Sequence, residues 1–365
     1  MCFDPTMVLY LCVDCGGTKT AAVISDESGQ VVGRGLGGPS NFNYLTVRQF
    51  VAAVKDAVEA ALQQAIPSSV ISLPPTELKP FVAAWFGISG ADSPVVIKKA
   101  ERALAELLGV PAGPDLIVAH DTHLLAAPLR LYQDVSHAVV VIAGTGSVVV
   151  SFKEEGKRIV ELARVGGWGW LLGDEGGGYD VGRETLRQIL LAHDKTSLTG
   201  IPLPKSKLIE NVLQTFGADN LLEIFAGVYR PDPSPSATIT PGEEKTFQNL
   251  AREKRISSLP PLVFEAAFED DDPLALDILK TAVDHLASQI AILLDEGTSS
   301  LAKIVKAEES VVSFGGSLAR VEEYRNLLLS NLAQRGHIFK RVVFIDDAAA
   351  TGAVGLAKVY DSKRS

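Results

Sequence analysis

Apolar runs separated by tight turns of small residues give the chain its most regular pattern. Residues 139–142 and 148–150 are β-branched runs that predict two buried strands, joined by the turn Gly144-Thr145-Gly146-Ser147. The same arrangement stands near the N-terminus, where an apolar run leads through Asp14 into the turn Gly16-Gly17-Thr18-Lys19-Thr20 and a second run. A design that occurs twice predicts a duplicated fold that holds one anionic ligand from both sides.

Strands and amphipathic helices alternate along the rest of the chain. In the first half, the pattern predicts strands at 31–36, 81–88 and 116–119, and helices at 47–65, at 94–108 and from Thr122. In the second half, it predicts strands at 159–165, 311–314 and 342–345, and helices at 179–193, 273–294, 318–334 and 348–360. The proline-rich residues 231–241 are expected to form a flexible insertion.

Both halves therefore repeat one plan, which predicts an α/β fold with two domains around a nucleotide cleft. A chain of 365 residues is long enough for two domains, each with its own core. We place the N-terminal α/β domain at residues 1–131 and the C-terminal α/β domain at residues 132–365. The last helix, at about 348–360, is expected to pack back on the N-terminal domain.

Composition and charge narrow the possible partners. The formal net charge of −10 argues against nucleic acid and against an anionic membrane surface, because both favour basic patches. An anionic ligand would then be held by backbone N–H groups and a metal ion. The cysteines, Cys2, Cys12 and Cys15, cluster at the N-terminus and form no disulfide framework, which favours a reducing compartment. With no signal-like or membrane-spanning segment, a cytoplasmic location is expected.

The ordered set of motifs resembles the sugar kinase, heat-shock ATPase and actin superfamily. Within it, the chain is similar to the N-acetylglucosamine kinase branch of the BadF/BadG ATPase family. The matching motifs cover the chain nearly end to end, in the family's order, at residues 14–20, 40–41, 89–92, 120–121, 144–147, 166–169, 173–176 and 314–317. The resemblance implies a duplicated actin-like, ribonuclease H-like ATPase fold.

The resemblance implies ATP and Mg²⁺ as cofactors. Glycine turns allow an anion to approach backbone N–H groups, and a plain hairpin turn is the alternative for each turn taken alone. Asp14 ends an apolar strand and is a suitable oxygen ligand for Mg²⁺ on ATP phosphates. The residues that match the family's nucleotide-binding positions are Gly16, Gly17, Thr18, Lys19, Thr20, Gly144, Thr145, Gly146, Gly315, Gly316 and Ser317.

The same resemblance assigns the substrate side of the site. Asp121 matches the family's aspartate that takes the proton from the sugar hydroxyl, and a helix N-cap is the alternative role for it. An amide, a carboxylate, backbone groups and an indole can all contact a sugar, although core packing is the alternative for Trp168. The matching sugar-binding positions are Asn41, Asp121, Gly167, Trp168, Gly169 and Asp174.

Three functions remain open at this point. The first is an ATP-dependent kinase that phosphorylates an amino sugar, with N-acetyl-D-glucosamine at its 6-hydroxyl as the expected substrate and a homodimer left open. The second is an activator ATPase with a bridging iron–sulfur cluster. It needs later cysteines, whereas none follows Cys15 and the thiols of Cys12 and Cys15 should point to opposite faces of a strand. The third is a non-redox ATPase or nucleotide-dependent sensor that phosphorylates no sugar.

Overall fold

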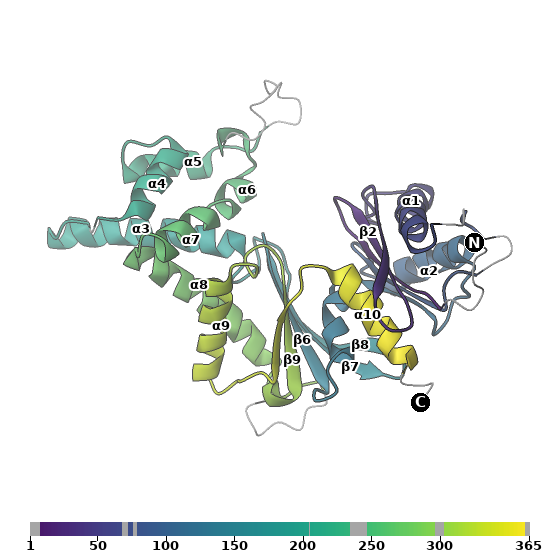
Figure 1. Cartoon of the computed structure of the whole chain (residues 1–365). Helices are drawn as coiled ribbons and strands as arrows, with labels where there is room; N and C mark the ends of the chain where they lie inside the picture. The colour runs from purple at the N-terminus through teal and green to yellow at the C-terminus, as the bar shows by residue number, and fades with distance from the viewer. Residues whose placement is uncertain are drawn as a thin grey trace.

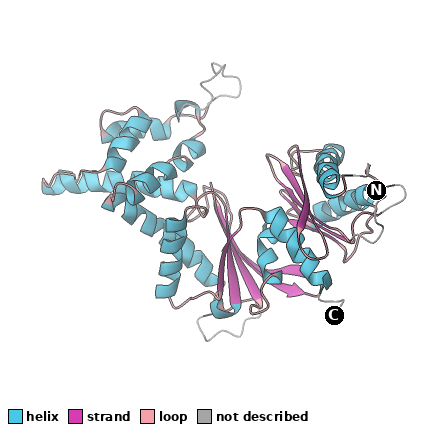
Figure 2. Ribbon diagram, in the orientation of Figure 1, coloured by secondary structure: helices cyan, strands magenta, loops and turns pink. Residues whose placement is uncertain are grey.

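Two five-stranded sheets with one shared topology form the frame of the molecule (Figures 1 and 2). The structure is a computed structural model that describes residues 8–67, 72–75, 79–203, 205–233, 247–295 and 303–361. The expected insertion at 231–241 lies mostly outside the described residues. Within these ranges, no helix combines the length and the hydropathy that crossing a bilayer requires.

The first sheet has the strand order β3-β2-β1-β4-β5. Its strands are β1 (Tyr10–Cys15), β2 (Thr20–Ser25), β3 (Val31–Gly37), β4 (Ala83–Ile88) and β5 (Leu116–His120). β1 to β3 form an antiparallel meander, whereas β1, β4 and β5 run parallel. The carboxyl ends of β1, β4 and β5 therefore meet at one edge of the sheet, where open α/β folds bind their ligands.

The second sheet repeats this plan in the order β10-β9-β6-β7-β8. Its strands are β6 (His137–Ala143), β7 (Ser147–Glu155), β8 (Arg158–Gly166), β9 (Ser310–Gly315) and β10 (Arg341–Phe344). β6 to β8 are antiparallel, and β6, β9 and β10 are parallel. β6 takes the place of β1 and β7 the place of β2, so the duplication predicted from the two glycine turns is confirmed.

Some helices pack on the faces of the sheets, whereas others pack mainly on one another, away from both sheets (Figure 1). Several begin or end at recognisable signals. Thr46 and Gln49 form a capping box at the start of α1, while Ser93 caps α2 and Gly109 ends it in the left-handed conformation. The helices are α1 (Val47–Ala65), α2 (Pro94–Leu108), η1 (Asp121–Arg130), α3 (Gly178–Thr199), α4 (Lys207–Phe216), η2 (Leu221–Glu223), α5 (Ile224–Tyr229), η3 (Phe247–Asn249), α6 (Arg252–Ser257), α7 (Pro260–Phe268), α8 (Pro273–Ile292), η4 (Ala307–Glu309), α9 (Glu322–Gln334) and α10 (Ala348–Asp361).

Strand alternation divides the first half of the molecule between two cores. Leu11 and Val13 of β1 pack with α1 and α2 on one face, whereas Tyr10 and Cys12 face the other side. That other side is shared by η1, α10 and residues of the second sheet, so η1 and α10 lie between the sheets (Figure 1). The hydroxyl of Ser25 donates to the carbonyl of Ala353 in α10 at 2.8 Å. The C-terminal helix thus returns to the first sheet, while the domain boundary at residue 131 stays a prediction.

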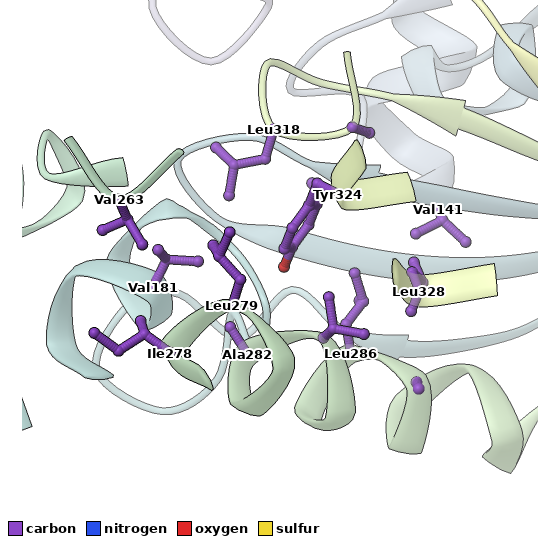
Figure 3. Close-up of a cluster of buried hydrophobic side chains, with 14 of the residues drawn as sticks. Val141, Val181, Val263, Ile278, Leu279, Ala282, Leu286, Leu318, Tyr324 and Leu328 are labelled. Carbon is purple, nitrogen blue, oxygen red and sulfur yellow. The ribbon is translucent and has the colours of Figure 1, made fainter. Parts of the chain in front are cut away.

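The core of the second half reaches the loop that follows β8. Leu279, Ala282 and Leu286 of α8 pack with Tyr324 and Leu328 of α9 (Figure 3). The hydroxyl of Tyr324, although buried in this apolar cluster, donates to the carbonyl of Gly176 at 2.7 Å. A buried hydroxyl needs such a partner, so this bond fixes the loop backbone to the core.

Two helix boundaries differ from the sequence prediction by more than two residues. The helix predicted from residue 318 begins at Glu322. The N–H groups of Leu318 and Ala319 instead donate to the carbonyl of Ala143, at 2.9 and 3.1 Å. Because of this contact with β6, the helix begins later than the apolar pattern predicts. No residue near 318 in the sequence indicates the contact. The helix predicted to end at residue 193 continues to Thr199, where Gly200 ends it at φ 70°.

Candidate active site

Asp14 and Asp121 come together at the carboxyl edge of the first sheet. Asp14 pairs in register with Gly87 of β4, on the face of β1 that turns toward η1. A Cβ atom at Gly87 would lie 3.1 Å from the Cα atom of Asp121 and closer still to the side chain of Leu124. The glycine therefore lets η1 begin directly against the end of β4. Two acids that are far apart in the sequence face one space.

Burial is the main cause that raises the pKa of Asp14 to about 6. The negative charges of Asp121 and Asp347 raise this pKa further, and the nearby Lys19 opposes them. The carboxylate of Asp14 is thus short of positive charge in the protein alone. A divalent cation would supply that charge, and an aspartate oxygen is a ligand type that Mg²⁺ accepts.

Asp121 has the opposite electrostatic balance. Burial would raise its pKa, but the hydrogen bond and charge of His120 and the donors on Thr122 and Ser89 lower it below the usual range. His120 Nδ1 lies 2.9 Å from Asp121 Oδ1, and His120 Nε2 lies 3.2 Å from Asp92 Oδ1. The imidazole thus bridges two carboxylates, and its own pKa is raised because these contacts outweigh its burial.

The N-cap of η1 is His120 rather than Asp121. The capping role considered for Asp121 therefore falls on its neighbour, and the carboxylate of Asp121 stands in the first turn. Sequence reasoning gave His120 no part in the site. Its position at the end of a buried strand, directly before Asp121, was the signal available.

Asn41 is connected to Asp121 through Ser89. The Asn41 side-chain amide donates to the Ser89 hydroxyl at 3.1 Å, and that hydroxyl in turn donates to Asp121. Gly90 stands beside them at φ 81°, and a Cβ atom there would come within 2.6 Å of Asn41 Oδ1. The structure thus brings together Asn41 and Asp121, two residues predicted to bind the sugar.

The first glycine turn presents its tip to solvent. Its base is fixed by hydrogen bonds from the Gly16 N–H to the Lys19 carbonyl at 3.0 Å and from the Ser40 N–H to the Gly16 carbonyl at 2.9 Å. Gly17, Thr18 and Lys19 are exposed, and a Cβ atom at Gly17 would meet nothing within 4 Å. The buried Thr20 hydroxyl, in contrast, is engaged by Ser40 and Gly38. The tip of this turn, and not Thr20, has the space for a ligand.

The second glycine turn is packed against the start of α3 and the loop before it. The N–H groups of Gly178 and Tyr179 donate to the carbonyls of Gly144 and Thr145, at 2.8 and 3.0 Å. The Ser147 hydroxyl donates to the Glu175 carbonyl at 2.7 Å. These bonds bind residues 174–178 to the turn.

Asp174 contacts the second glycine turn directly. Burial raises the pKa of Asp174, while the N–H groups of Ser147 and Gly169 donate to its carboxylate and oppose that rise. Asp174 adopts φ 62°, and a Cβ atom at Gly146 would overlap its carboxylate. The predicted sugar residue Asp174 therefore lies on the predicted phosphate turn.

The third glycine loop lies beside the second turn. A Cβ atom at Gly144 would come within 3.8 Å of the Ser317 nitrogen, and one at Gly316, at φ 97°, would overlap the Ala143 carbonyl. Only glycine fits this approach without strain. A Cβ atom at Gly315 would lie 2.8 Å from Leu125 of η1, so η1 reaches both sheets. The structure thus gathers Gly144, Thr145, Gly146, Gly315, Gly316 and Ser317 in one place.

Trp168 stands apart from these groups. Its side chain is 75% exposed, so the core-packing alternative for it is wrong. Within the described ranges, no hydrogen bond or ring contact joins the Trp168 indole to Asn41 or Asp121. Next to it, a Cβ atom at Gly167 would lie 3.0 Å from a guanidinium nitrogen of Arg164, whose charge also acts on His120. Arg164 therefore stands between the two parts of the predicted sugar site, and sequence reasoning missed it.

Glu175, Asp180 and His285 bring three groups of metal-ligand type within 4.8 Å of one another. The Asp180 carboxylate, only 1% exposed, accepts from the Gly176 N–H at 2.8 Å, from His285 Nδ1 at 2.9 Å and from Arg183 at 2.5 Å. A cationic guanidinium thus already neutralises this carboxylate. The cluster serves to hold the backbone of residues 174–178 in place.

Comparison with known proteins adds a family and a fold. The BadF/BadG/BcrA/BcrD ATPase family matches residues 11–357. The chain is 25% identical to the N-acetylmuramic acid/N-acetylglucosamine kinase of Clostridium acetobutylicum over 354 residues, 95% of this chain and 97% of that one. It is 30% identical to the N-acetyl-D-glucosamine kinase of Dictyostelium discoideum over 204 residues, which cover 55% of this chain and only 61% of that enzyme.

Solved structures agree with the observed fold. A protein of Chromobacterium violaceum, provisionally named an N-acetylglucosamine kinase, has a TM-score of 0.57 at 22% identity and covers 96% of this chain and 99% of its own. A protein of the same provisional name from Porphyromonas gingivalis has a TM-score of 0.56 at 23% identity, with 98% and 100% covered. At these identities the likeness shows the fold, and it confirms the predicted duplicated ATPase fold.

Proposed function

Since the chain belongs to the BadF/BadG/BcrA/BcrD ATPase family, we propose that it is an ATP-dependent kinase that phosphorylates an amino sugar. N-acetyl-D-glucosamine, phosphorylated at its 6-hydroxyl, is the proposed substrate. The kinases of Clostridium acetobutylicum and Dictyostelium discoideum support this choice through their named activities. The observation that carries the proposal is the chain of contacts Asn41–Ser89–Asp121–His120 at the carboxyl edge of the first sheet.

The residues present fit Mg²⁺ and ATP. Asp14, whose pKa is raised chiefly by burial and further by the charges of Asp121 and Asp347, would hold the Mg²⁺. The open tip at Gly17, Thr18 and Lys19 would offer backbone N–H groups to phosphate oxygens, as would Thr145 and Gly146 of the second turn, whose base is closed by the bond from the Gly144 N–H to the Gly146 carbonyl. Gly315, Gly316 and Ser317 would lie on the adenosine side. When bound, Mg²⁺-ATP supplies the phosphoryl group and neutralises the charge on it.

The proton of the sugar hydroxyl would pass to the Asp121 carboxylate. Its lowered pKa keeps this carboxylate ionised at neutral pH, so it is ready to accept a proton. His120 fixes the orientation of the carboxylate through one oxygen, and Ser89 contributes a second hydrogen bond. Asn41 would then hold a sugar hydroxyl beside the base. Asp174 and the backbone of Gly167 and Gly169, with Trp168, would contact the sugar from the second half.

The activator-ATPase alternative loses support from the cysteine positions. Cys12 and Cys15 are both buried, and they belong to separate cores on opposite faces of β1. Burial raises the pKa of both thiols well above the usual range, which disfavours the thiolate that an iron–sulfur cluster needs. A non-redox ATPase and a sensor without turnover remain alternatives to the kinase.

An assay of ADP release with Mg²⁺-ATP and a panel of sugars tests the proposal. N-acetylglucosamine should stimulate release strongly, and its 6-deoxy analogue, which lacks the accepting hydroxyl, should give only the background rate. ADP release at one rate with every sugar and without sugar would support the ATPase instead. Binding of ATP without any release would support the sensor. Either result would contradict the kinase.

A further inference from the structure

A pocket of about 460 Å³ lies among the helices that pack away from the two sheets. Its walls come from α4, α5, η3 and α6, and the labelled α4, α5 and α6 stand at the end of the molecule opposite α1 and α2 (Figure 1). The residues that line it are all different from those predicted to bind ATP or the sugar. We call this pocket the α4–α6 pocket. A volume of this size is typical of a site for a small molecule.

Two aromatic rings form an apolar wall of the α4–α6 pocket. Phe216 of α4 and Phe247 of η3 meet edge to face, with their ring centroids 4.6 Å apart. A Cβ atom at Gly227 of α5 would lie 2.4 Å from the Phe216 ring, so the glycine lets this ring lie directly against α5. Ala218 and Ala226, which also line the pocket, add only methyl groups. The wall therefore suits the apolar part of a ligand.

A buried arginine forms another part of the wall. Arg255 of α6 lines the α4–α6 pocket although it is only 1% exposed. Its Nη2 donates to the carbonyl of Arg230, but within the described ranges neither its Nε nor its Nη1 has an acceptor. Buried N–H groups of a charged side chain are costly to leave unpaired, so each such group in a folded protein calls for an explanation. A bound anion would accept from these groups.

Positive charge prevails around Arg255. Burial lowers the pKa of Arg255, and the charges of Arg252 and Arg230 lower it further, whereas the charge of Asp232 opposes them. The Asp232 carboxylate accepts from the backbone N–H of Arg252 at 2.6 Å. The Nε of Arg252 also lacks an acceptor among the described residues. Two neighbouring arginines thus have N–H groups available for one anion.

The acid that lines the α4–α6 pocket is already engaged elsewhere. One oxygen of Glu223 accepts from the N–H of Asp219 at 2.9 Å, and the other accepts from the side-chain amide of Asn220 at 2.6 Å. Glu223 therefore closes the turn before η2. In the part of the chain that the structure describes, Arg255 forms no ion pair with a carboxylate.

We propose that the α4–α6 pocket binds a small phosphomonoester whose carbon part is apolar, with Arg255 as the residue that binds the phosphate. A phosphate group suits the unpaired N–H groups of two arginines because it offers three acceptor oxygens, whereas a carboxylate offers two. A guanidinium also matches the geometry of phosphate oxygens. The rings of Phe216 and Phe247 would contact the carbon part. The site goes beyond the proposed kinase reaction, since it takes no part in phosphoryl transfer.

Calorimetric titration with phenyl phosphate tests this site. Mg²⁺ and a non-hydrolysable ATP analogue are added at saturating concentrations, so that the proposed nucleotide site is filled. Inorganic phosphate, which lacks the ring, and benzoate, which replaces phosphate by a carboxylate, are titrated for comparison. The proteins are the wild type, Arg255→Met and the matched control Lys254→Gln. Lys254 belongs to the same helix, but it does not line the pocket and its ammonium group pairs with Glu253 at 3.4 Å.

We expect the wild type to bind phenyl phosphate about tenfold or more tightly than benzoate or inorganic phosphate. Arg255→Met should lower the affinity for phenyl phosphate by about tenfold or more, and Lys254→Gln should keep it. Absence of binding to the wild type, equal affinities of the wild type and Arg255→Met, or equal affinities for benzoate and phenyl phosphate would overturn the proposal.

A second variant keeps Arg255 and decides the matter if Arg255→Met fails to fold. Ala226 is an exposed residue of α5 that lines the α4–α6 pocket, so Ala226→Phe should fill part of the pocket and leave the core unchanged. We expect this variant to lose the binding of phenyl phosphate while its urea unfolding matches that of the wild type. Undiminished binding would overturn the pocket as the site. These measurements need no turnover of a sugar, so a failure of the proposed kinase function would remain a separate result.

Discussion

The two glycine turns have nearly the same sequence design and very different surroundings. The turn at 16–20 carries exposed residues at its tip, and a side chain at Gly17 would meet nothing within 4 Å. In the turn at 144–147 Thr145 alone is exposed, and the turn packs against residues 174–178 and against Gly316 and Ser317. The difference arises from the segment after the third strand of each sheet. β3 leads into α1, whereas β8 leads into a long helical segment whose first loop packs on the turn.

This difference assigns separate tasks to the two halves. The first half contributes the carboxylates of Asp14 and Asp121 and an open turn. The second half contributes loops that are fixed to one another and to the core through Tyr324 and Asp180. The two sheets are therefore similar, and the segments that connect their strands determine what each half contributes to the site. Four sets of substitutions test this division of tasks.

The largest effect is expected at Asp121. Asp121→Asn keeps the size of the side chain but cannot accept a proton, so kcat should fall by about 10²- to 10⁴-fold. The affinity of Asp121→Asn for ATP should equal that of the wild type. Asp92→Asn is the matched control, because Asp92 contacts the far nitrogen of the same imidazole and has a 60% exposed side chain. Near-normal turnover in Asp121→Asn, or an equal loss in both variants, would contradict the assignment.

The next effect concerns Asp14 and depends on pH. Its folded-state pKa of about 6 exceeds the ordinary value of 3.8, so the folded protein binds this proton more tightly than the unfolded chain. The unfolding free energy should therefore fall as the pH rises from about 4 through 6. Asp14→Asn removes this penalty and should stabilise the free protein at pH 7.5 by up to about 3 kcal/mol. The gain should shrink toward pH 4.

Urea unfolding of Asp14→Asn and wild type at several pH values measures this difference. Asp121→Asn provides a control of opposite sign, because the lowered pKa of Asp121 makes its ionised form stabilising at neutral pH. A destabilised Asp14→Asn at pH 7.5, or a gain that does not change with pH, would show that Asp14 is not short of positive charge.

A pair of alanine substitutions compares the two turns directly. Gly146→Ala forces a methyl group onto the Asp174 carboxylate and should cost about 1–3 kcal/mol of stability. Gly17→Ala has free space and should change stability by less than about 1 kcal/mol. Equilibrium unfolding of both variants is the measurement. An equal loss of stability in both variants would contradict the difference in packing between the two turns.

The smallest effect is expected at His285, which helps to hold residues 174–178. The hydrogen bond to Asp180 raises the pKa of His285 above 6.5, so its stabilisation is complete below that pH and is lost as the pH rises through the folded-state pKa. His285→Gln should therefore destabilise the protein more at pH 6 than at pH 8.5. The difference should be a few tenths of a kcal/mol to about 1 kcal/mol, since the imidazole is 35% exposed. A pH-independent difference would count against the pairing.

Most of the fold could be predicted because its signals are local. The helices at Val47–Ala65 and Pro94–Leu108 have the predicted bounds, which follow from apolar spacing, capping residues and Pro94. The delayed start of α9 could not be predicted, since it depends on hydrogen bonds to the distant Ala143. The full length of α3 could have been predicted from Gly200, which is a typical C-terminal signal.

The site could be predicted only in part, for the same reason. Glycine turns and strand-end acids are visible in the sequence, and they led to Asp14, Asp121 and the three loops. The roles of His120, Ser89 and Arg164 depend on groups that are distant in the chain, since His120 contacts Asp92, Ser89 contacts Asn41, and the charge of Arg164 acts on His120. The contact between Asp174 and Gly146 could not be predicted either, because it forms only when the second turn and the loop before α3 pack together.

The central claim is that the two unlike turns act on one nucleotide, with the carboxylates of the first half beside it. A crystal structure with Mg²⁺, a non-hydrolysable ATP analogue and N-acetylglucosamine tests this claim most directly. The account predicts phosphate oxygens in contact with the backbone of both Gly16–Thr20 and Gly144–Ser147, Mg²⁺ near Asp14, and the sugar 6-hydroxyl within hydrogen-bond distance of Asp121. Phosphates held by one turn alone, or a sugar bound away from Asp121, would contradict it.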